Sequence, residues 1–239
     1  MIRAGWSGPA RGPWWPRSAR TPGLAFRIFA SLVLALLATS SQRAVAQLAN
    51  SSSVLTVAET EDLARRVDYE GLPEDEAARI GARGAARLVE MLADPDEAPH
   101  HARILLALGI WGGDGALEAM RNWASLSQAG GEIDRDRFRA WQVLPFALGK
   151  LARRDSRAVA ELAARFDAEA PAWSFRQFRG ARLLALERRA AAAALAQTRL
   201  PDAERVLDAV VRRVDDPALA DHVRALRSEA RGAPTGDAR

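Results

Sequence analysis

The chain has 239 residues, of which 49% are hydrophobic and 27% are charged, the balance of an ordinary globular protein. It contains no cysteine, so disulfides, thiolate-bound zinc, iron–sulfur clusters and covalently attached c-type haem are excluded. The formal net charge is +4, but the first 46 residues carry six Arg and no acid, which leaves 28 basic and 30 acidic residues in the rest. The charge of the whole chain therefore gives no argument for nucleic-acid binding.

The first 46 residues have the pattern of a secretory signal peptide. Residues 1–27 are basic, an apolar run follows at 28–38, and Ala44-Val45-Ala46 supplies a small-x-small cleavage site. The alternative is a membrane anchor, but a span needs about 20 apolar residues, and Arg27 and Arg43 bound a shorter run. We expect cleavage after Ala46 and no stable membrane span afterwards.

The ratio of arginine to lysine indicates the kind of genome that encodes the chain. Only Lys150 among the 34 basic residues is a lysine, and Ala and Gly are abundant, which is typical of a GC-rich genome. Together with the leader, this predicts an exported bacterial protein that is periplasmic or secreted.

After the leader, the sequence predicts a fold made of helices. Ala, Leu and Arg are strong helix formers, and no period-2 strand pattern is found after residue 47. We expect a flexible lead-in at 47–57, a helical domain at 58–231 and a disordered tail at 232–239. The expected helices, in chain order, are 58–67, 74–93, 99–111, 117–124, 137–152, 155–166, 173–198, 202–214 and 217–230.

Two helix–turn–helix units in this domain resemble each other. Ala107-Leu108-Gly109 recurs 40 residues later as Ala147-Leu148-Gly149, with similar flanks over 104–120 and 143–162. This spacing resembles the HEAT repeat, whose units run about 40–47 residues. Pro145 inside the first helix of its unit fits, because a proline there kinks the helix.

The resemblance implies an all-α fold, a short right-handed α-solenoid of antiparallel helix pairs. It covers 99–167 and extends less closely over 74–98. The segment 200–226 is more similar to a tetratricopeptide unit. A bundle of amphipathic helices without true repeats is the alternative architecture.

The most site-like cluster of polar residues follows the second expected helix, and consists of Asp94, Asp96, Glu97, His100 and His101. Carboxylates and imidazoles can hold a divalent metal. However, Pro95 and Pro99 place the cluster in a loop, where acids before a helix stabilise its N-terminus, and adjacent histidines diverge on a helix. We interpret the cluster as structural, Asp134 and Asp136 as a helix start, and His222 as a surface residue. No cofactor or metal is predicted.

Catalytic motifs are missing from the sequence. There is no Gly-x-Ser-x-Gly elbow, no His-Glu-x-x-His helix and no phosphate-binding glycine loop, and Gly112-Gly113-Asp114-Gly115 joins two helices as a turn. A pair of catalytic carboxylates among the 30 acids stays an alternative. The large aromatic residues at helical spacing are expected mostly in the core. They are Trp111, Trp123, Trp141 and Trp173.

The distribution of charge suggests a binding surface. Residues 47–134 contain 16 acids and 7 basic residues, whereas residues 135–189 contain 6 acids and 13 basic residues. We predict a non-catalytic scaffold that binds an acidic protein or peptide through this basic middle segment. The candidate partner-binding residues are Arg139, Arg153, Arg154 and Arg157. The alternatives are a carboxylate-based enzyme of envelope metabolism and a binder of an anionic polymer.

Overall fold

A computed structural model of the chain describes residues 53–67, 71–126, 130–213 and 216–232. By its internal contacts the chain separates into Met1–Asn50 and Ser51–Arg239, and every described residue belongs to the second unit. The predicted leader, its cleavage site, most of the lead-in and the tail after Gly232 lie outside the described residues.

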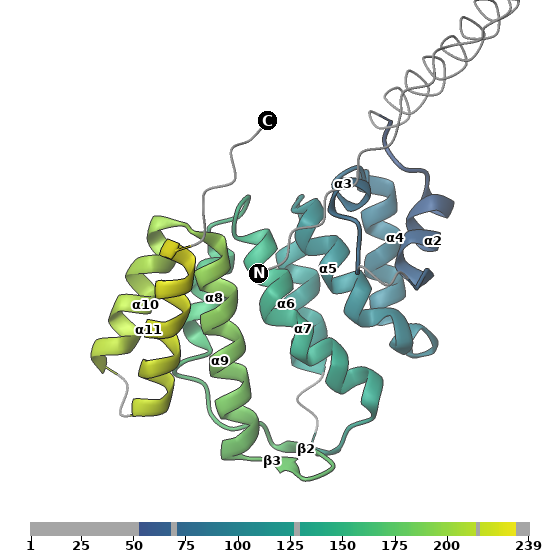
Figure 1. Cartoon of the computed structure of the whole chain (residues 1–239). Helices are drawn as coiled ribbons and strands as arrows, with labels where there is room; N and C mark the ends of the chain where they lie inside the picture. The colour runs from purple at the N-terminus through teal and green to yellow at the C-terminus, as the bar shows by residue number, and fades with distance from the viewer. Residues whose placement is uncertain (1–52, 68–70, 127–129, 214–215, 233–239) are drawn as a thin grey trace, which may run out of the picture. The chain divides into compact units, whose positions relative to one another are not determined.

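The described residues are mainly helical, as predicted (Figure 1). They form ten α-helices, one 3₁₀ helix and three short strands. The helices are α2 (Val57–Arg65), α3 (Glu74–Ala77), α4 (Ala82–Ala93), η1 (Pro95–His100), α5 (His101–Trp111), α6 (Ala116–Leu126), α7 (Arg135–Leu151), α8 (Arg157–Ala164), α9 (Ala181–Thr198), α10 (Pro201–Arg213) and α11 (Pro217–Gly232). None of these helices is long and apolar enough to cross a membrane.

Local sequence explains where several helices begin and end. Thr56 and Glu59 form a capping box at the start of α2, and the Asp134 carboxylate accepts a hydrogen bond from the backbone of Arg137 at the start of α7. Gly112 ends α5 with φ of 64°, in the left-handed region that glycine adopts without strain. These caps satisfy backbone groups that the helix itself leaves unpaired.

Two predicted helices are shorter than expected. The predicted helix at 74–93 is interrupted between α3 and α4, where Ile80 forms a bridge with Leu55. The predicted helix at 173–198 begins only at Ala181, because residues 173–179 form two strands.

The strands form one small sheet in the order β1-β2-β3. Its members are β1 (Gly131–Glu132), β2 (Trp173–Phe175) and β3 (Phe178–Arg179). β1 is parallel to β2, and β2 is antiparallel to β3. The expectation that no strand follows residue 47 is wrong here, because strands of two or three residues are too short for an alternating pattern to be recognised.

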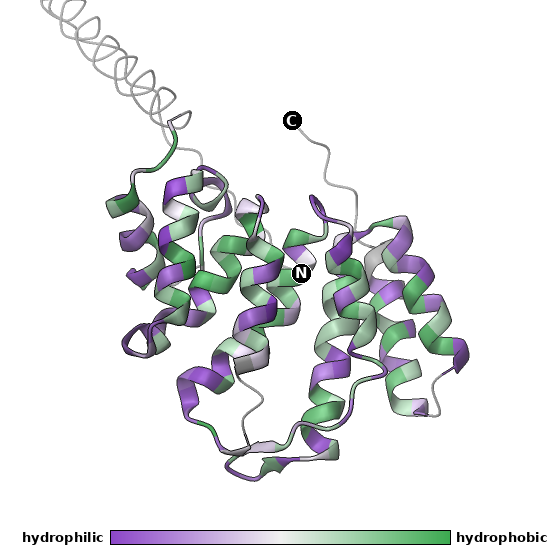
Figure 2. Ribbon diagram, turned by 180° about the vertical axis from the view of Figure 1, so that it is seen from behind, coloured by the Kyte–Doolittle hydropathy of each residue, from purple (hydrophilic) through white to green (hydrophobic). Residues whose placement is uncertain are grey.

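The helices from α5 onward pack in a regular manner (Figures 1 and 2). α5 lies along α7, α7 along α9, and α9 along α11. Each of α6, α8 and α10 contacts two of these helices: α6 contacts α5 and α7, α8 contacts α7 and α9, and α10 contacts α9 and α11. The same hydrophobic core therefore continues through all of these helices.

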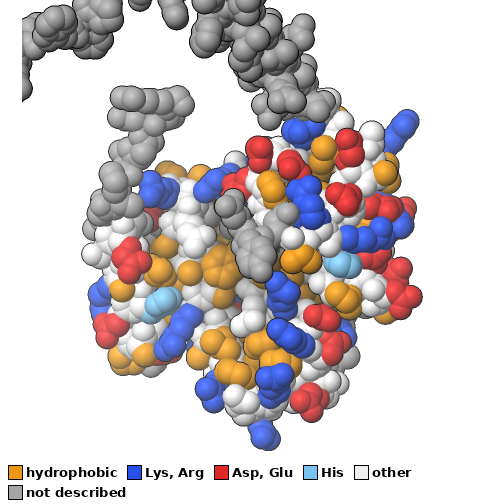
Figure 3. Space-filling model, turned by 45° about the vertical axis from the view of Figure 1, so that its right-hand side comes forward, with side chains coloured by type: hydrophobic (Ala, Val, Ile, Leu, Met, Phe, Trp, Pro, Cys, Tyr) orange, Lys and Arg blue, Asp and Glu red, His pale blue; other side chains and the backbone are white. Residues whose placement is uncertain are grey.

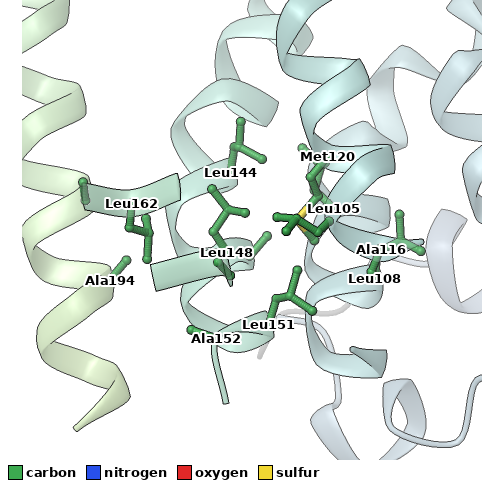
Figure 4. Close-up of a cluster of buried hydrophobic side chains, with 14 of the residues drawn as sticks. Leu105, Leu108, Ala116, Met120, Leu144, Leu148, Leu151, Ala152, Leu162 and Ala194 are labelled. Atoms are coloured by element: carbon green, nitrogen blue, oxygen red, sulfur yellow. The ribbon is translucent and has the colours of Figure 1, made fainter. Parts of the chain in front are cut away.

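Leucines and alanines fill this core, as the close-up in Figure 4 shows. Leu105 and Leu108 of α5 face Leu148 and Leu151 of α7, and Leu162 of α8 lies on the other side of α7. Three of the four tryptophans expected in the core are buried, and Trp111 is half-buried. The buried ones are Trp123, Trp141 and Trp173.

Glycine permits the closest contacts between neighbouring helices. A Cβ atom at Gly109 would lie 2.3 Å from the carbonyl oxygen of Ala147, and one at Gly149 would lie 3.2 Å from that of Ala194. The Ala-Leu-Gly segment of α5 therefore meets the same segment of α7, which in turn meets Ala194-Leu195-Ala196 of α9. A side chain at either glycine would push the helix backbones apart.

Gly109→Ala should destabilise the protein although alanine is the better helix former. The propensity gain is about 1 kcal/mol, whereas overpacking against a backbone carbonyl costs about 1–3 kcal/mol. We expect a net loss of about 1 kcal/mol in the free energy of unfolding, measured by urea denaturation. Gly149→Ala should cause a smaller loss of stability, because the added Cβ atom would lie farther from the neighbouring backbone and the helices would have to shift less. A Gly109→Ala protein more stable than wild type would contradict the close packing of α5 on α7.

Candidate binding surface

An aromatic cluster joins the start of α7 to the small sheet. The ring of Phe138 stacks on that of Phe175, with centroids 4.1 Å apart, and lies 5.9 Å from that of Phe178. Trp141, one turn further along α7, meets Trp173 of β2 edge to face at 5.0 Å. Phe138, Trp141 and Trp173 are buried, whereas Phe175 and Phe178 are only partly buried. The cluster fixes the sheet to the helices and leaves two phenylalanine rings near the surface.

One arginine stacks on each of these two rings. The guanidinium carbon of Arg176 lies 5.2 Å from the centroid of Phe175, and that of Arg182 lies 4.5 Å from the centroid of Phe178. Both distances are in the range of cation–π contacts. We call these residues, together with the exposed arginines at the start of α7 and in β3, the strand-end surface. Its members are Arg135, Arg139, Phe175, Arg176, Phe178, Arg179 and Arg182.

The five arginines of the strand-end surface are exposed, and none forms an ion pair with an acid in the described part of the chain. Two nearby carboxylates are already engaged by backbone groups: Glu132 accepts from the backbone of Arg176, and Asp134 caps α7. In Figure 3, basic side chains gather around hydrophobic ones at the lower end of the molecule, where the strands lie. The five arginines outnumber the neighbouring acids Glu132, Asp134 and Asp136, so this end presents a net positive charge beside apolar rings.

The four arginines predicted to bind a partner lie at two places. Arg139 is on the first turns of α7 and belongs to the strand-end surface, whereas Arg153, Arg154 and Arg157 follow the other end of this helix. At 1.5 Å per residue, the length of α7 separates the two places by about 20 Å. Arg153 is exposed, like Arg139, and has no ion pair within the described residues.

The other two of these arginines make contacts within the molecule. The Nη1 of Arg154 donates to the carbonyl oxygen of Trp111 at 2.6 Å, at the C-terminus of α5. Arg157 pairs with Asp155 at 2.7 Å and approaches Glu118 of α6 to 3.5 Å. These bonds connect the α7–α8 turn to the preceding pair of helices.

The loop cluster that resembled a metal site has structural contacts instead. The Asp94 carboxylate accepts from the backbone of Asp96 and so caps η1, and Glu97 forms an ion pair with Arg65 of α2. That ion pair holds the pKa of Glu97 below its usual value. Among the described residues, no group of three or more His, Asp or Glu is arranged to hold a metal ion. Asp136 and His222 are half-buried on α7 and α11.

His101 is a buried histidine with both ring nitrogens hydrogen-bonded. Its Nε2 lies 3.3 Å from the carbonyl oxygen of Met91 and 3.2 Å from that of Asp94, and its Nδ1 accepts a hydrogen bond from the indole of Trp123 at 3.1 Å. These contacts fix the neutral tautomer with the proton on Nε2. Burial lowers the pKa of His101 below its ordinary value of 6.5, and the two carbonyls only partly oppose this shift.

Acid should therefore weaken the fold through His101. Because its pKa is lower in the folded protein, the unfolded chain binds this proton first as the pH falls below 6.5, and stability is lost between 6.5 and the folded pKa. We expect the free energy of unfolding in urea to decline from pH 7.5 to pH 5.5, and to decline less in His101→Gln.

The control variant is His222→Gln, which should keep the decline of the wild type. If His101→Gln followed the same pH dependence as the wild type, His101 would not be the responsible group.

Two hollows meet at Trp141 and Glu187, which line both of them. The larger, of about 410 Å³, lies among α8, the loop after it and α9, and also contains Glu161 and Glu169. Glu187 forms an ion pair with Arg165, and Glu161 forms one with Arg121 of α6. Two of the three carboxylates in this hollow are therefore neutralised by arginine.

The second hollow, of about 300 Å³, lies between α7 and α9 and has mainly apolar walls. Pro145, Phe146 and Leu186 contribute to them. It is close to the strand-end surface, because Gln142 and Leu186 in its lining follow Arg139 and Arg182 by three and four residues on the same helices.

No relative of the chain is found. The chain matches no protein-family model, no curated protein and no solved structure. The interpretation of its surface therefore rests on its own residues.

Part of the strand-end surface lies in a segment for which the sequence predicts a helix starting at residue 173. This segment contains Phe175, Arg176, Phe178, Arg179 and Arg182. The sequence offers one weak signal: three aromatic residues, Trp173, Phe175 and Phe178, precede Gly180, and a glycine there favours a break before the helix.

Proposed function

We propose that this chain is an exported, HEAT-like helical scaffold that binds an acidic protein or peptide through the strand-end surface and catalyses no reaction. One observation carries the proposal: Arg176 and Arg182 stack on two partly exposed phenylalanine rings, and three more exposed arginines of the same segments, Arg135, Arg139 and Arg179, form no ion pair in the described chain.

The helix contacts support a repeat architecture. Equivalent segments at 107–109, 147–149 and 194–196 meet at the contacts between α5, α7 and α9. The second helices of successive pairs are linked as well, because Arg121 of α6 forms an ion pair with Glu161 of α8, 40 residues later. Contacts that recur from one helix pair to the next are what a solenoid requires.

The composition of the surface favours a protein partner over a polymer. Arginine and aromatic residues are the groups that dominate binding energy at protein interfaces. Stacking on Phe175 and Phe178 restricts Arg176 and Arg182 before binding, which lowers the entropic cost of association. An anionic polymer would use the charges but would gain little from the rings.

The larger hollow gives less support to an enzyme. A carboxylate mechanism needs one group to donate a proton and another to accept it. Here Glu161 and Glu187 are each held in an ion pair with an arginine of the protein. This arrangement supports a structural role for them.

Charge reversal on the strand-end surface should weaken binding to an acidic polypeptide. The change is Arg135, Arg139 and Arg179 to Glu together, because these side chains are exposed and have no ion pair in the described part of the chain. Placing like charges against the partner adds repulsion and slows association, so we expect affinity for labelled poly-glutamate to fall about tenfold or more at low salt. The measurement is fluorescence anisotropy, with circular dichroism to verify the helix content.

The matched control changes Arg83, Arg153 and Arg212 to Glu, three exposed arginines elsewhere that also form no ion pair among the described residues. Its net charge is the same, so an equal loss of affinity in both proteins would mean that overall charge, and no particular surface, determines binding. Because the control includes Arg153, a loss of affinity in the control protein alone would indicate that the α7–α8 turn is the binding surface. Heparin bound more tightly than poly-glutamate would favour the polymer alternative.

Export is tested separately. Protein recovered from the producing cells should begin at Gln47, because Ala44 and Ala46 provide the small residues that signal peptidase needs. Mass spectrometry of the N-terminal peptide measures this. Intact peptides across the bond between Ala46 and Gln47 in most of the protein would contradict cleavage there.

A further inference from the structure

The apolar cleft lies where α7 and α9 diverge toward their N-termini (Figure 1). The two helices approach closely where Gly149 meets Ala194, near the C-terminal end of α7. Toward their N-termini the bulky rings of Phe138, Trp141 and Trp173 lie between α7 and the sheet that precedes α9. The residues that line the opening are Trp141, Pro145 and Phe146 from α7 and Leu186, Ala190 and Ala193 from α9.

The size of the cleft suits a small ligand group. Its volume of about 300 Å³ is at the lower end of pockets that hold small molecules. Ala190 and Ala193 are only partly buried, so short side chains leave the α9 wall open to solvent. A single bulky side chain of a partner could enter here and be shielded from water.

Positive charge surrounds the cleft. Arg189 lines it, and Arg139 and Arg182 lie one turn before Gln142 and Leu186, the lining residues nearest the strands. None of these three arginines forms an ion pair within the described residues. The one carboxylate in the lining, Glu187, is paired with Arg165. An apolar ligand that also carried negative charge on both sides would therefore match the cleft and its rim.

We propose that this cleft is the anchor site for one bulky apolar side chain of an acidic peptide. Carboxylates on either side of the anchor would pair with Arg139, Arg182 and Arg189. The proposal rests on the function proposed above, since it uses the same basic end of the molecule, and it adds the feature that selects among acidic partners. Burying one apolar side chain should distinguish an acidic peptide with an anchor from one without.

The test compares two short labelled peptides that differ at one position. Both are glutamate-rich, and the central residue is leucine in one and serine in the other. We expect the leucine peptide to bind the wild-type chain about tenfold more tightly by fluorescence anisotropy, as burial of such a side chain implies. Ala193→Phe should fill the cleft and remove this difference in affinity between the leucine and serine peptides.

Matched variants separate the cleft from the charges. Ala160→Phe places the same ring on an exposed position of α8 and should keep the preference for leucine. If Ala193→Phe folds poorly, Ala190→Leu is a second variant that fills the cleft. It should also reduce the preference for the leucine peptide over the serine peptide. Charge reversal at Arg135, Arg139 and Arg179 should weaken the binding of both peptides.

The outcomes distinguish the two proposals. Equal binding of the leucine and serine peptides to the wild type would overturn the anchor site and leave the basic surface standing. Binding of neither peptide would overturn both proposals. If decanoate bound in the cleft, was blocked by Ala193→Phe, and the two peptides bound equally, the occupant would be a lipid chain and the peptide anchor would be wrong.

Discussion

The contact between helix backbones at Gly109 and Gly149 determines the arrangement of the rest of the unit. Because neither position has a side chain, α5 approaches α7, and α7 approaches α9, near the same end of each helix. Leucines on either side of these glycines then fill the core (Figure 4). Where the helices diverge, the gap needs larger groups, and aromatic rings supply them. Close contact at one end thus leaves the aromatic rings and the candidate surface at the other.

The arginines of residues 135–189 have different roles at the two ends of α7. At the end with close contacts, Arg154 and Arg157 bond to neighbouring elements and help to hold the helix pairs together. At the strand end, Arg139 and the arginines of the hairpin have no acidic partner in the described chain. A charge that is already paired inside a protein is less available to a ligand. The distribution of ion pairs therefore locates the candidate surface more closely than the count of basic residues does.

The helical fold was predictable because it depends on local patterns: apolar spacing, capping residues and turn glycines. The burial of Trp141 followed from the same patterns, whereas the hydrogen bond between His101 and Trp123 was not predicted. The hairpin before α9 was not predicted either, because its strands are two or three residues long and exist through pairing with β1, about 40 residues earlier. The roles of Arg154 and Arg157 likewise depend on Trp111 and Glu118 in another helix pair. Such distant contacts leave no periodic trace in the sequence.

The repeated Ala-Leu-Gly segment has a consequence for the effect of substitutions in α7. In α7, Ala147 contacts Gly109 of the preceding helix α5, and Gly149 contacts Ala194 of the following helix α9. The same three residues therefore make close contacts with both neighbouring helices. A substitution within this segment therefore affects a different neighbour according to its position: at Ala147 the contact with α5, and at Gly149 the contact with α9. In α9 the third residue is Ala196, whose methyl group does not permit the same approach. Within the described chain, the glycine contacts of this segment therefore join α5, α7 and α9.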